Sequence, residues 1–363
     1  MIRLKKARRE PLPDGTTVLF LNNKELVIQA CLAKDRNALF YKASDRNTGQ
    51  AVVLKEFFPG HWVRHDSAPA LNGWEQCSAE EVRLGRLYIW LRHQAEREQR
   101  INWELCRSVR CVIPEKKPLY VGTLRLPDGT IWQKPFCVFL EMDGMTAEPG
   151  FPLRALMQEC TWPHSPEHPF GNLHRQEDGP GSSRSCAVPA AAVTMQVFRD
   201  ILLALHQLHD AEWVMGKLDI GDVFVKGSLA GGIIRGVSFM DVSSARKTGE
   251  SAAPCGTGPG FDVPEPFPGP ADKKTDVLLA GQLLLSILYP IAVHNIRLGR
   301  PLDFLEEIQT LTEGESIPSG LQQDMRAEVN RLLLQATTPD PEQRIPLDEM
   351  LAAADDWCRR LER

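Results

Sequence analysis

The first half of the chain alternates short apolar runs with polar turns. TTVLFL and ELVIQACL are separated by Asn22 and Asn23, and the turn DRNTGQ separates ALFYKAS from AVVLKEFF. Such β-branched and aromatic runs between turn residues are typical of antiparallel strands. Further strands are predicted at PLYVGTLRL and FCVFLEM. A single long helical pattern, roughly Ala79 to Cys106, interrupts them.

From about residue 150 the pattern becomes helical. AAVTMQVFRDILLALHQLHD has apolar residues at helical spacing, and a stretch rich in Pro, Gly, His and Ser, Cys160 to Ser185, precedes it. Further helices are predicted at FPLRALMQ, DVLLAGQLLLSIL, PLDFLEEIQTL, GLQQDMRAEVNRLLLQA and PLDEMLAAADDWCRRLE. A β-rich first part and a helical second part predict an α+β protein with two lobes and a hinge near residues 141–150.

Composition indicates a soluble globular protein. The 363 residues are 43% hydrophobic and 25% charged, which is ordinary, and the net charge of −5 gives no case for nucleic acid. The longest apolar run, Leu283 to Val293, is too short for a bilayer and contains Pro290, so we expect no membrane span. The basic N-terminus lacks the apolar stretch of a secretory signal.

The cysteines point to a reducing compartment. There are nine, an odd and scattered set with no C-x-x-C pair, which is unlike a disulfide framework. We therefore expect a cytoplasmic protein, with export as an effector left open. The stretch from Cys160 to Cys186 also holds three histidines, but the long spacing favours a mobile loop over a zinc site.

Four short motifs occur in a fixed order along this framework. They are AVVLKEFFP, CVFLEMDG, VMGKLDIGDVFV and FMDVSSAR. In that order, with one helix among the strands and helices after them, the chain resembles the protein kinase-like superfamily over about residues 24 to 360. The segments GRLYIW and LKEFFPG and the loose inserts are similar to those of bacterial Ser/Thr protein kinases.

The resemblance implies a fold and a domain division. The implied fold is α+β and bilobal, with a small antiparallel β-sheet lobe that carries one helix and a larger, mainly helical lobe. Residues 1–23 would be an N-terminal tail and hairpin, 24–143 the smaller lobe, and 144–363 the larger lobe with a flexible insert at 160–185.

The resemblance also implies a nucleotide site. Lys55, ending an apolar strand, would bind the α and β phosphates of ATP. The adenine would lie against the strand and hinge formed by Leu140, Glu141, Met142 and Asp143. Asp222 and Asp241 are the candidate ligands for Mg²⁺, because carboxylates suit that ion.

The residue that would carry catalysis is missing from the third motif. Lys217 occupies the position of the catalytic aspartate, and a charged ammonium cannot accept a proton. To act as a base, Lys217 would need a pKa lower by roughly 3 units, which costs about 4 kcal/mol. Asp219 is the candidate displaced base, although a structural ion pair between Lys217 and Asp219 is the favoured interpretation.

Other family positions also depart from the pattern. The phosphate-loop glycines are replaced by Ala33, Asp35 and Ala38. The helix glutamate that would pair with Lys55 aligns with Gln94. Glu96 and Glu98 are near, but one or two residues along a helix turn a side chain by roughly 100–200°. The positions that hold the family's fold together are better kept. Among them are Glu265 and Arg344, for which the resemblance implies a buried ion pair.

These features predict a pseudokinase that is catalytically inactive or nearly so. We expect a protein-binding scaffold or regulatory module that needs no cofactor and binds ATP and Mg²⁺ weakly at most. The alternative is a weakly active or atypical Ser/Thr kinase, or another nucleotidyl or phosphoryl transferase, that uses Asp219. A protein partner is expected, and Trp62 and Trp74 are candidate anchors for it.

Overall fold

The structure is a computed structural model. It describes nine segments of the chain, which are residues 11–34, 38–57, 79–133, 137–142, 150–153, 191–228, 233–251, 270–288 and 323–362.

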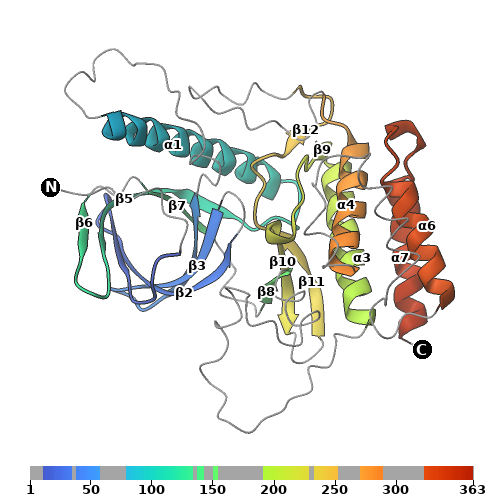
Figure 1. Ribbon diagram of the computed structural model, residues 1–363, viewed down its shortest axis with the longest axis horizontal. Coiled ribbons are helices and arrows are strands. Elements are labelled where there is room, and N and C mark those ends of the chain that lie inside the picture. The colour runs from blue at the N-terminus through green and yellow to red at the C-terminus, as the bar shows by residue number, and fades with distance from the viewer. Residues whose placement is uncertain are drawn as a thin grey trace, which may run out of the picture.

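The first part of the chain forms a closed six-stranded antiparallel β-barrel (Figure 1). Its strands follow the spatial order β1, β2, β3, β4, β7, β5, and β5 pairs back to β1, with Val18 opposite Leu124. Strand β6 extends β5 as a hairpin. The strands are β1 (Thr17–Phe20), β2 (Glu25–Lys34), β3 (Ala38–Asp45), β4 (Ala51–Phe57), β5 (Glu115–Arg125), β6 (Ile131–Gln133) and β7 (Val138–Met142).

Strand alternation fills the barrel and decides which side chains face outward. The interior is a cluster of buried apolar side chains in which Phe139 packs edge-on against Phe20 and beside Tyr41. Along β4, Leu54 belongs to this interior cluster, so its neighbour Lys55 points to the outer face. That outer face is covered by helix α1 (Ala79–Cys106) and by the second part of the chain (Figure 1).

The expected bilobal protein kinase-like fold is wrong. The strands do not form a small antiparallel sheet lobe; they close into a barrel. The described residues also contain five α-helices and two smaller sheets. The closing strand β1 lies within residues 1–23, which were expected to be a tail and hairpin. The two side chains of β1 that face the barrel interior, Val18 and Phe20, are buried, so burial of apolar surface drives the closure.

The second part of the chain builds two small sheets between the barrel and helices α3 and α4 (Figure 1). Strand β10 (Val223–Ser228) lies between β8 (Gly150–Pro152) and β11 (Ile233–Phe239), and β9 (Trp213–Val214) pairs with β12 (Arg246–Lys247). Short 3₁₀ turns occur at Ile220–Asp222 and Pro341–Gln343.

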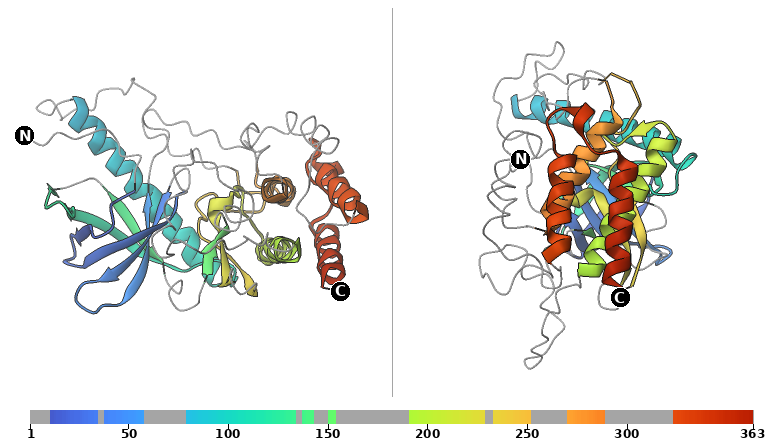
Figure 2. Two further views of the ribbon diagram at one scale, coloured as in Figure 1. Left: turned by 60° about the horizontal axis from the view of Figure 1, so that its bottom comes forward. Right: turned by 90° about the vertical axis from the view of Figure 1, so that its right-hand side faces the viewer.

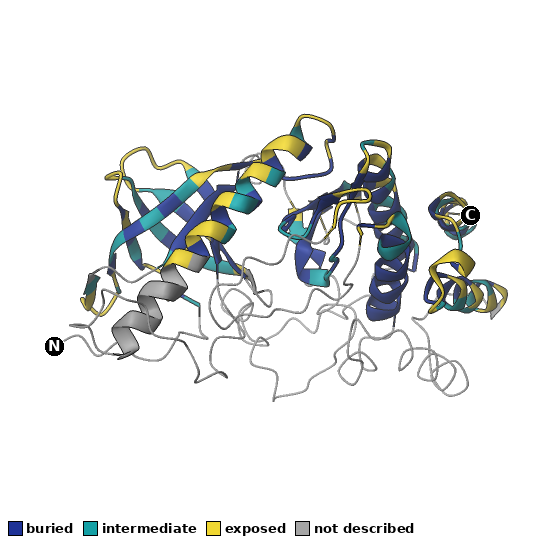
Figure 3. Cartoon of the chain, turned by 90° about the horizontal axis from the view of Figure 1, so that it is seen from above, coloured by how far each residue is buried: buried dark blue, intermediate teal, exposed yellow. Residues whose placement is uncertain are grey.

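Four helices stack beyond these sheets (Figure 2). They are α3 (Ala191–Asp210), α4 (Lys273–Leu288), α6 (Gln323–Ala336) and α7 (Leu347–Leu361). Helix α3 packs on β11 and α7, and α4 packs on α3 and α6. Every residue of α4 from Asp276 to Leu288 is buried, so this helix is the centre of the second core (Figure 3).

The helical spacing of apolar residues predicted most of the described helices. The helices predicted at residues 79–106 and 191–210 are confirmed with those bounds, and those predicted around residues 276–288, 320–336 and 346–362 are present. The predicted helix at 151–158 is wrong at its start, because Phe151 and Pro152 belong to strand β8 and pair with β10. Residues 154–158, the predicted helix at 301–311 and the insert at 160–185 lie outside the described residues. Among the helices of the described segments, none combines the length and the apolar character that crossing a membrane requires.

Candidate functional site

A cluster of buried charges lies where the barrel, helix α1 and the second part of the chain meet. At its centre, the ammonium of Lys55 forms an ion pair with Glu98 of α1 and lies 3.4 Å from Oδ1 of Asp241. All three side chains are buried. The backbone N–H of Val242 also donates to Glu98, at 3.3 Å, so Glu98 connects α1 both to the barrel and to the segment after β11.

Lys217 is the second cation of the cluster. Its Nζ lies 3.4 Å from Oδ1 of Asp222 and 3.4 Å from Oδ2 of Asp241. Lys217 is 22% exposed, whereas the two aspartates are almost fully buried, so Lys217 is the solvent-facing side of the cluster. Asp241 therefore lies between Lys55 on one oxygen and Lys217 on the other.

The backbone before Lys217 is held by a buried carboxylate. Asp276 at the start of α4 accepts hydrogen bonds from the N–H groups of Met215 and Gly216, at 2.8 and 2.9 Å, and contacts Nε2 of His209 at 2.9 Å. Gly216 has φ of +70°, a left-handed conformation that favours glycine. A Cβ at this position would lie 2.9 Å from the carbonyl oxygen of Ser244. These contacts fix the point from which Lys217 extends.

Two further carboxyls make the cluster rich in negative charge. Glu115, the first residue of β5, is buried beside Glu98, and its backbone N–H donates to Asn102 of α1 at 3.0 Å. Within the described residues, neither oxygen of Glu115, nor Oε2 of Glu98, has a hydrogen-bonding partner. A proton shared between Oε2 of Glu98 and one oxygen of Glu115 would give each of these two oxygens a partner. Four carboxyls, those of Glu98, Glu115, Asp222 and Asp241, thus face two ammonium groups.

The pKa directions agree with this arrangement. Burial raises the pKa of Glu115 to about 7, against the opposing attraction of Lys55. Burial and the neighbouring Glu115 likewise raise the pKa of Glu98. Burial alone would raise the pKa of Asp241, but Lys55 and Lys217 outweigh it and hold that pKa well below its usual range. Burial opposes the charge of Lys55, yet Asp241 and Glu98 raise its pKa. The site therefore keeps Lys55 charged and Asp241 ionised.

The structure separates Asp219 from Lys217. Instead of pairing with that lysine, Asp219 caps the 3₁₀ turn by accepting from the N–H of Gly221 at 3.3 Å. Its own N–H donates to Oδ2 of Asp222 at 2.8 Å. The expected ion pair between Lys217 and Asp219 is therefore wrong, because the turn gives Asp219 a capping role and brings Asp222 to the lysine.

The four residues assigned to the adenine do not form one surface. Leu140 packs with Leu91 and Ala95 of α1, whereas Met142 packs with Phe224 and Met240.

The side chain of Glu141 is engaged elsewhere on the barrel. It pairs with Lys24 and, at 2.6 Å, with Lys116. Burial works against the ionised form, but the hydrogen bonds from Lys116 and Lys24 lower the pKa of Glu141. Asp143 lies outside the described residues.

The partner of Lys55 is Glu98 and not Gln94. Glu98 comes four positions after Gln94, which is about 400° of helix, or 40° beyond a full turn, so the alignment placed the contact one turn early. Gln94 is half-buried, and Glu96 is exposed and accepts from Tyr120 Oη at 2.8 Å. Glu115 was missed altogether. Its only signal was a charged residue at the start of an apolar strand, which is also common in solvent-exposed strand ends.

Other predicted features fall partly or wholly outside the described segments. Glu265, Trp62, Trp74 and the cysteine and histidine stretch all do so. Arg344 is described, and its guanidinium donates to the carbonyl oxygens of Thr338, Lys274 and Pro339. Within the described segments, no group of three or more metal-ligating side chains is assembled.

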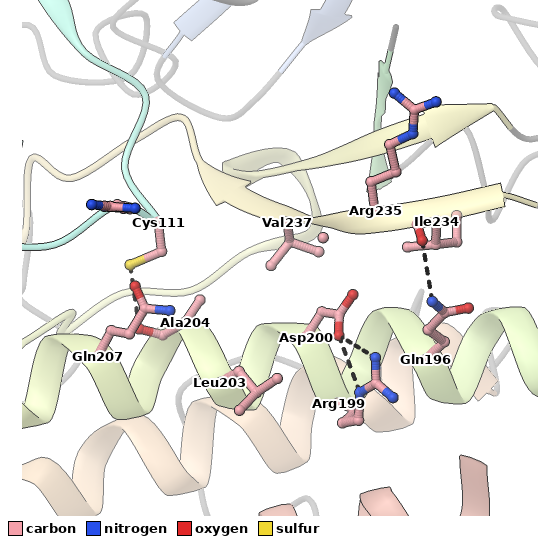
Figure 4. Close-up of a pocket in the computed structure, with 12 residues that line it drawn as sticks. Cys111, Gln196, Arg199, Asp200, Leu203, Ala204, Gln207, Ile234, Arg235 and Val237 are labelled. Atoms are coloured by element: carbon pink, nitrogen blue, oxygen red, sulfur yellow. Dashed lines mark hydrogen bonds and ion pairs between the residues drawn. The ribbon is translucent and has the colours of Figure 1, made fainter. Parts of the chain in front are cut away.

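A pocket of about 290 Å³ lies between α3 and β11 and shares no residue with the charge cluster (Figure 4). Its polar groups help to pack the helix on the strand. Gln196 donates to the carbonyl oxygen of Ile234 at 3.2 Å, Arg199 pairs with Asp200 at 2.8 Å, and Cys111 contacts the carbonyl oxygen of Ala204 (Figure 4). We therefore place the candidate site at the charge cluster.

No family model matches the chain, and no curated protein matches it either. Together with the closed barrel, this overturns the resemblance to the protein kinase-like superfamily and to bacterial Ser/Thr kinases. The short motifs occur in the kinase order, but the strands around them close into a barrel through the pairing of β1 with β5. The name pseudokinase therefore does not apply.

Proposed function

We propose that this protein is a regulatory, protein-binding module, catalytically inactive or nearly so in phosphoryl transfer, whose charge cluster binds ATP weakly at most. The observation that carries the proposal is the position of Lys217. Its ammonium lies 3.4 Å from both Asp222 and Asp241, where a proton acceptor or a metal ion would otherwise face these carboxylates.

Weak binding follows from the charges around Lys55. A phosphate oxygen must compete for Lys55 with Glu98 and Asp241, which already neutralise it in a buried setting. The cluster also holds more carboxyls than ammonium groups, which opposes a polyphosphate electrostatically. Lys217, the more exposed cation, is the group best placed to offer the first contact to an incoming anion.

The supported role is therefore one of binding rather than reaction. Asp219, the candidate displaced base, already uses one carboxylate oxygen to cap a turn. A protein without a base can still transmit the occupancy of its site to a partner, because the cluster joins the barrel to the second part of the chain. We accordingly propose a protein partner that distinguishes the nucleotide-bound form from the free form.

Thermal unfolding in the presence of ATP tests the proposal. At ten times the dissociation constant, a ligand adds about 1.4 kcal/mol to the free energy of unfolding, a shift on the order of 2 °C for a protein of this size. We expect at most such a shift at millimolar ATP, measured with and without Mg²⁺. A shift on the order of 10 °C at micromolar ATP would contradict weak binding.

Labelled ATP tests the absence of catalysis. With γ-labelled and α-labelled ATP, we expect no transfer to the protein or to a general protein substrate. The Asp219→Asn variant is the matched control, because asparagine keeps an oxygen for the N–H of Gly221 and removes only the base. Transfer from γ-labelled ATP that disappears in this variant would establish a kinase, and transfer from α-labelled ATP would establish adenylyl transfer.

A further inference from the structure

We propose that the groove between α3 and β11 binds the C-terminal segment of a partner protein. The segment would lie extended along the free edge of β11, with its terminal carboxylate at Arg110. This inference rests on the proposed function and deepens it, because it supplies the surface and the chemistry that the protein partner has to match.

The groove follows one face of helix α3. Its helix-side residues span about three turns, or roughly 16 Å, which is the length of about five residues of extended chain. They are Gln196, Arg199, Asp200, Leu203, Ala204 and Gln207.

The opposite wall comes from β11 and from the turn at Arg110 and Cys111. Figure 4 shows Cys111 and Gln207 at one end of the groove, and Gln196 and Ile234 at the other. The volume of about 290 Å³ is near the lower end for ligand pockets, which suits a few residues of peptide rather than a folded domain.

The edge of β11 that borders the groove has room for another strand. One side of β11 pairs with β10. On the other side, within the described residues, only Phe239 has backbone partners: it donates to the carbonyl oxygen of Cys111 at 2.7 Å and accepts from the N–H of Ile113 at 3.1 Å. Because alternate residues of a strand direct their backbone groups to the same edge, Val237 presents its N–H and C=O there too. Such an edge recruits an extended peptide as an additional strand.

The direction of the added strand follows from residues 111–113. Val112 forms a parallel bridge with Phe239. Before Arg110 the chain curls back toward α1, where the N–H of Val109 donates to the carbonyl oxygen of Leu105 at 2.8 Å. A peptide that extends the line of residues 111–113 along β11, in the same direction, therefore has its carboxyl end at Arg110. An antiparallel peptide would bring its amino end there instead.

Charge decides between these two directions. Arg110 is exposed and, in the segments that the structure describes, forms no ion pair. Arg199 is already paired with Asp200 at 2.8 Å, and Arg235 extends from β11 on the side away from α3 (Figure 4). Arg110 is therefore the cation that the groove offers, and a guanidinium binds a carboxylate through two parallel hydrogen bonds. A C-terminal carboxylate satisfies this group, whereas a terminal ammonium would be repelled.

The groove also offers apolar surface close to Arg110. Leu203 is 40% exposed on α3, although it is a large apolar side chain. Its neighbour Ala204 lies at the Cys111 end, where its carbonyl oxygen is 3.4 Å from Sγ of Cys111, and Val237 faces it from β11. The bound segment should therefore carry an apolar side chain close to its carboxyl end.

The experiment screens the full-length protein against a library of random heptapeptides with free carboxyl ends, and measures the enriched peptides by fluorescence anisotropy. We expect the enriched sequences to share an apolar residue within about three positions of the carboxyl end. Conversion of the terminal carboxylate to a carboxamide should weaken binding by about tenfold or more, because a charge-assisted pair is lost. Arg110→Ala should cause a similar loss, and the carboxamide should then add little to it.

Two further variants locate the peptide in the groove. Leu203→Glu should weaken binding by about tenfold or more, because it places a charge on the apolar surface and beside the peptide's carboxylate. Arg235→Ala is the matched control, since it removes the same charge as Arg110→Ala from a side chain that points away from α3, and it should change affinity by less than about twofold. All three side chains are exposed, so the variants should fold, which circular dichroism checks.

The inference is overturned if no peptide is enriched, or if the enriched peptides bind Arg110→Ala as tightly as the native protein. It is equally overturned if they tolerate both the carboxamide and Leu203→Glu. Tight ATP binding or phosphoryl transfer, by contrast, would overturn the proposed function and leave these peptide measurements unchanged.

Discussion

The ammonium of Lys55 and the carboxylate of Glu98 form an ion pair that joins the outer face of the barrel to helix α1, and neither side chain is more than 1% exposed. Glu98 also accepts from the N–H of Val242, so this one carboxylate connects three parts of the molecule. A buried pair adds little stability over a well-packed apolar pair, but removing one partner is costly, because the other charge remains buried.

The first prediction follows from this pair. Glu98→Ala should lower the free energy of unfolding by about 3–5 kcal/mol, because the ammonium of Lys55 stays buried and loses its ion pair with Glu98, keeping a longer contact of 3.4 Å with Asp241. Urea denaturation followed by circular dichroism measures the change. The matched control is Glu96→Ala, two residues along the same helix, where the side chain is 47% exposed and the expected loss is below about 1 kcal/mol. Equal losses at the two positions would contradict the assigned pair.

The second prediction concerns Gly216, which sets the direction of Lys217. Gly216→Ala should lower the free energy of unfolding by about 2–4 kcal/mol, because it adds the strain of positive φ to a 2.9 Å approach to the Ser244 carbonyl oxygen. Gly249→Ala is the control: φ there is +77°, but nothing lies within 4 Å of the added Cβ, so only about 1 kcal/mol should be lost. Thermal unfolding of the two variants distinguishes backbone strain from the clash.

Much of the secondary structure could be predicted from the sequence, whereas barrel closure could not. Helical spacing located α1 and α3 because an amphipathic helix shows its period over many residues. Strand β1 lies in the run TTVLFL, where Leu19 is 38% and Leu21 is 67% exposed while Val18 and Phe20 face the interior. Since both faces of β1 carry apolar residues, the sequence lacks the alternation of apolar and polar residues that would place this strand in a barrel.

The candidate site could be predicted only in part. Lys55, Asp222 and Asp241 were selected from short motifs, and the structure brings all three into one cluster with Lys217. Glu115 was missed, and the partner of Lys55 was placed one helical turn too early. Contacts between distant segments depend on helix phase and on tertiary packing, and a single sequence carries little information on either.

The third prediction concerns Arg344, whose guanidinium reaches three carbonyl oxygens at 2.8–3.0 Å. A lysine has no planar fork of donors and cannot serve three carbonyls in this geometry. Arg344→Lys should therefore lower the free energy of unfolding by about 2–3 kcal/mol, since carbonyl groups in a part-buried setting lose their donors. Arg359→Lys, at a side chain that is 68% exposed, should change it by less than about 0.5 kcal/mol. A similar small effect at Arg344 would show that these hydrogen bonds add no net stability.

The last prediction is a dependence of stability on pH that originates at Glu115. Its pKa is raised from 4.5 to about 7 in the folded protein, chiefly by burial. The folded state therefore binds the proton more tightly than the unfolded chain does, so the free energy of unfolding falls as pH rises from about 4.5 to about 7. The loss is complete above that range and amounts to about 3 kcal/mol for a shift of this size.

Glu115→Gln should remove the part of this dependence that Glu115 contributes, whereas Glu98, whose pKa is also raised, contributes the rest. Glutamine has nearly the same volume and carries no proton to lose, so the variant should be more stable than the native protein at pH 8 by about 1–3 kcal/mol and similar to it at pH 5. Glu115→Ala, which also loses packing, should be less stable than Glu115→Gln at every pH but show the same flattened slope. Urea denaturation from pH 5 to pH 8 measures both variants. An unchanged slope in Glu115→Gln would mean that the proton is held by Glu98 rather than shared with Glu115.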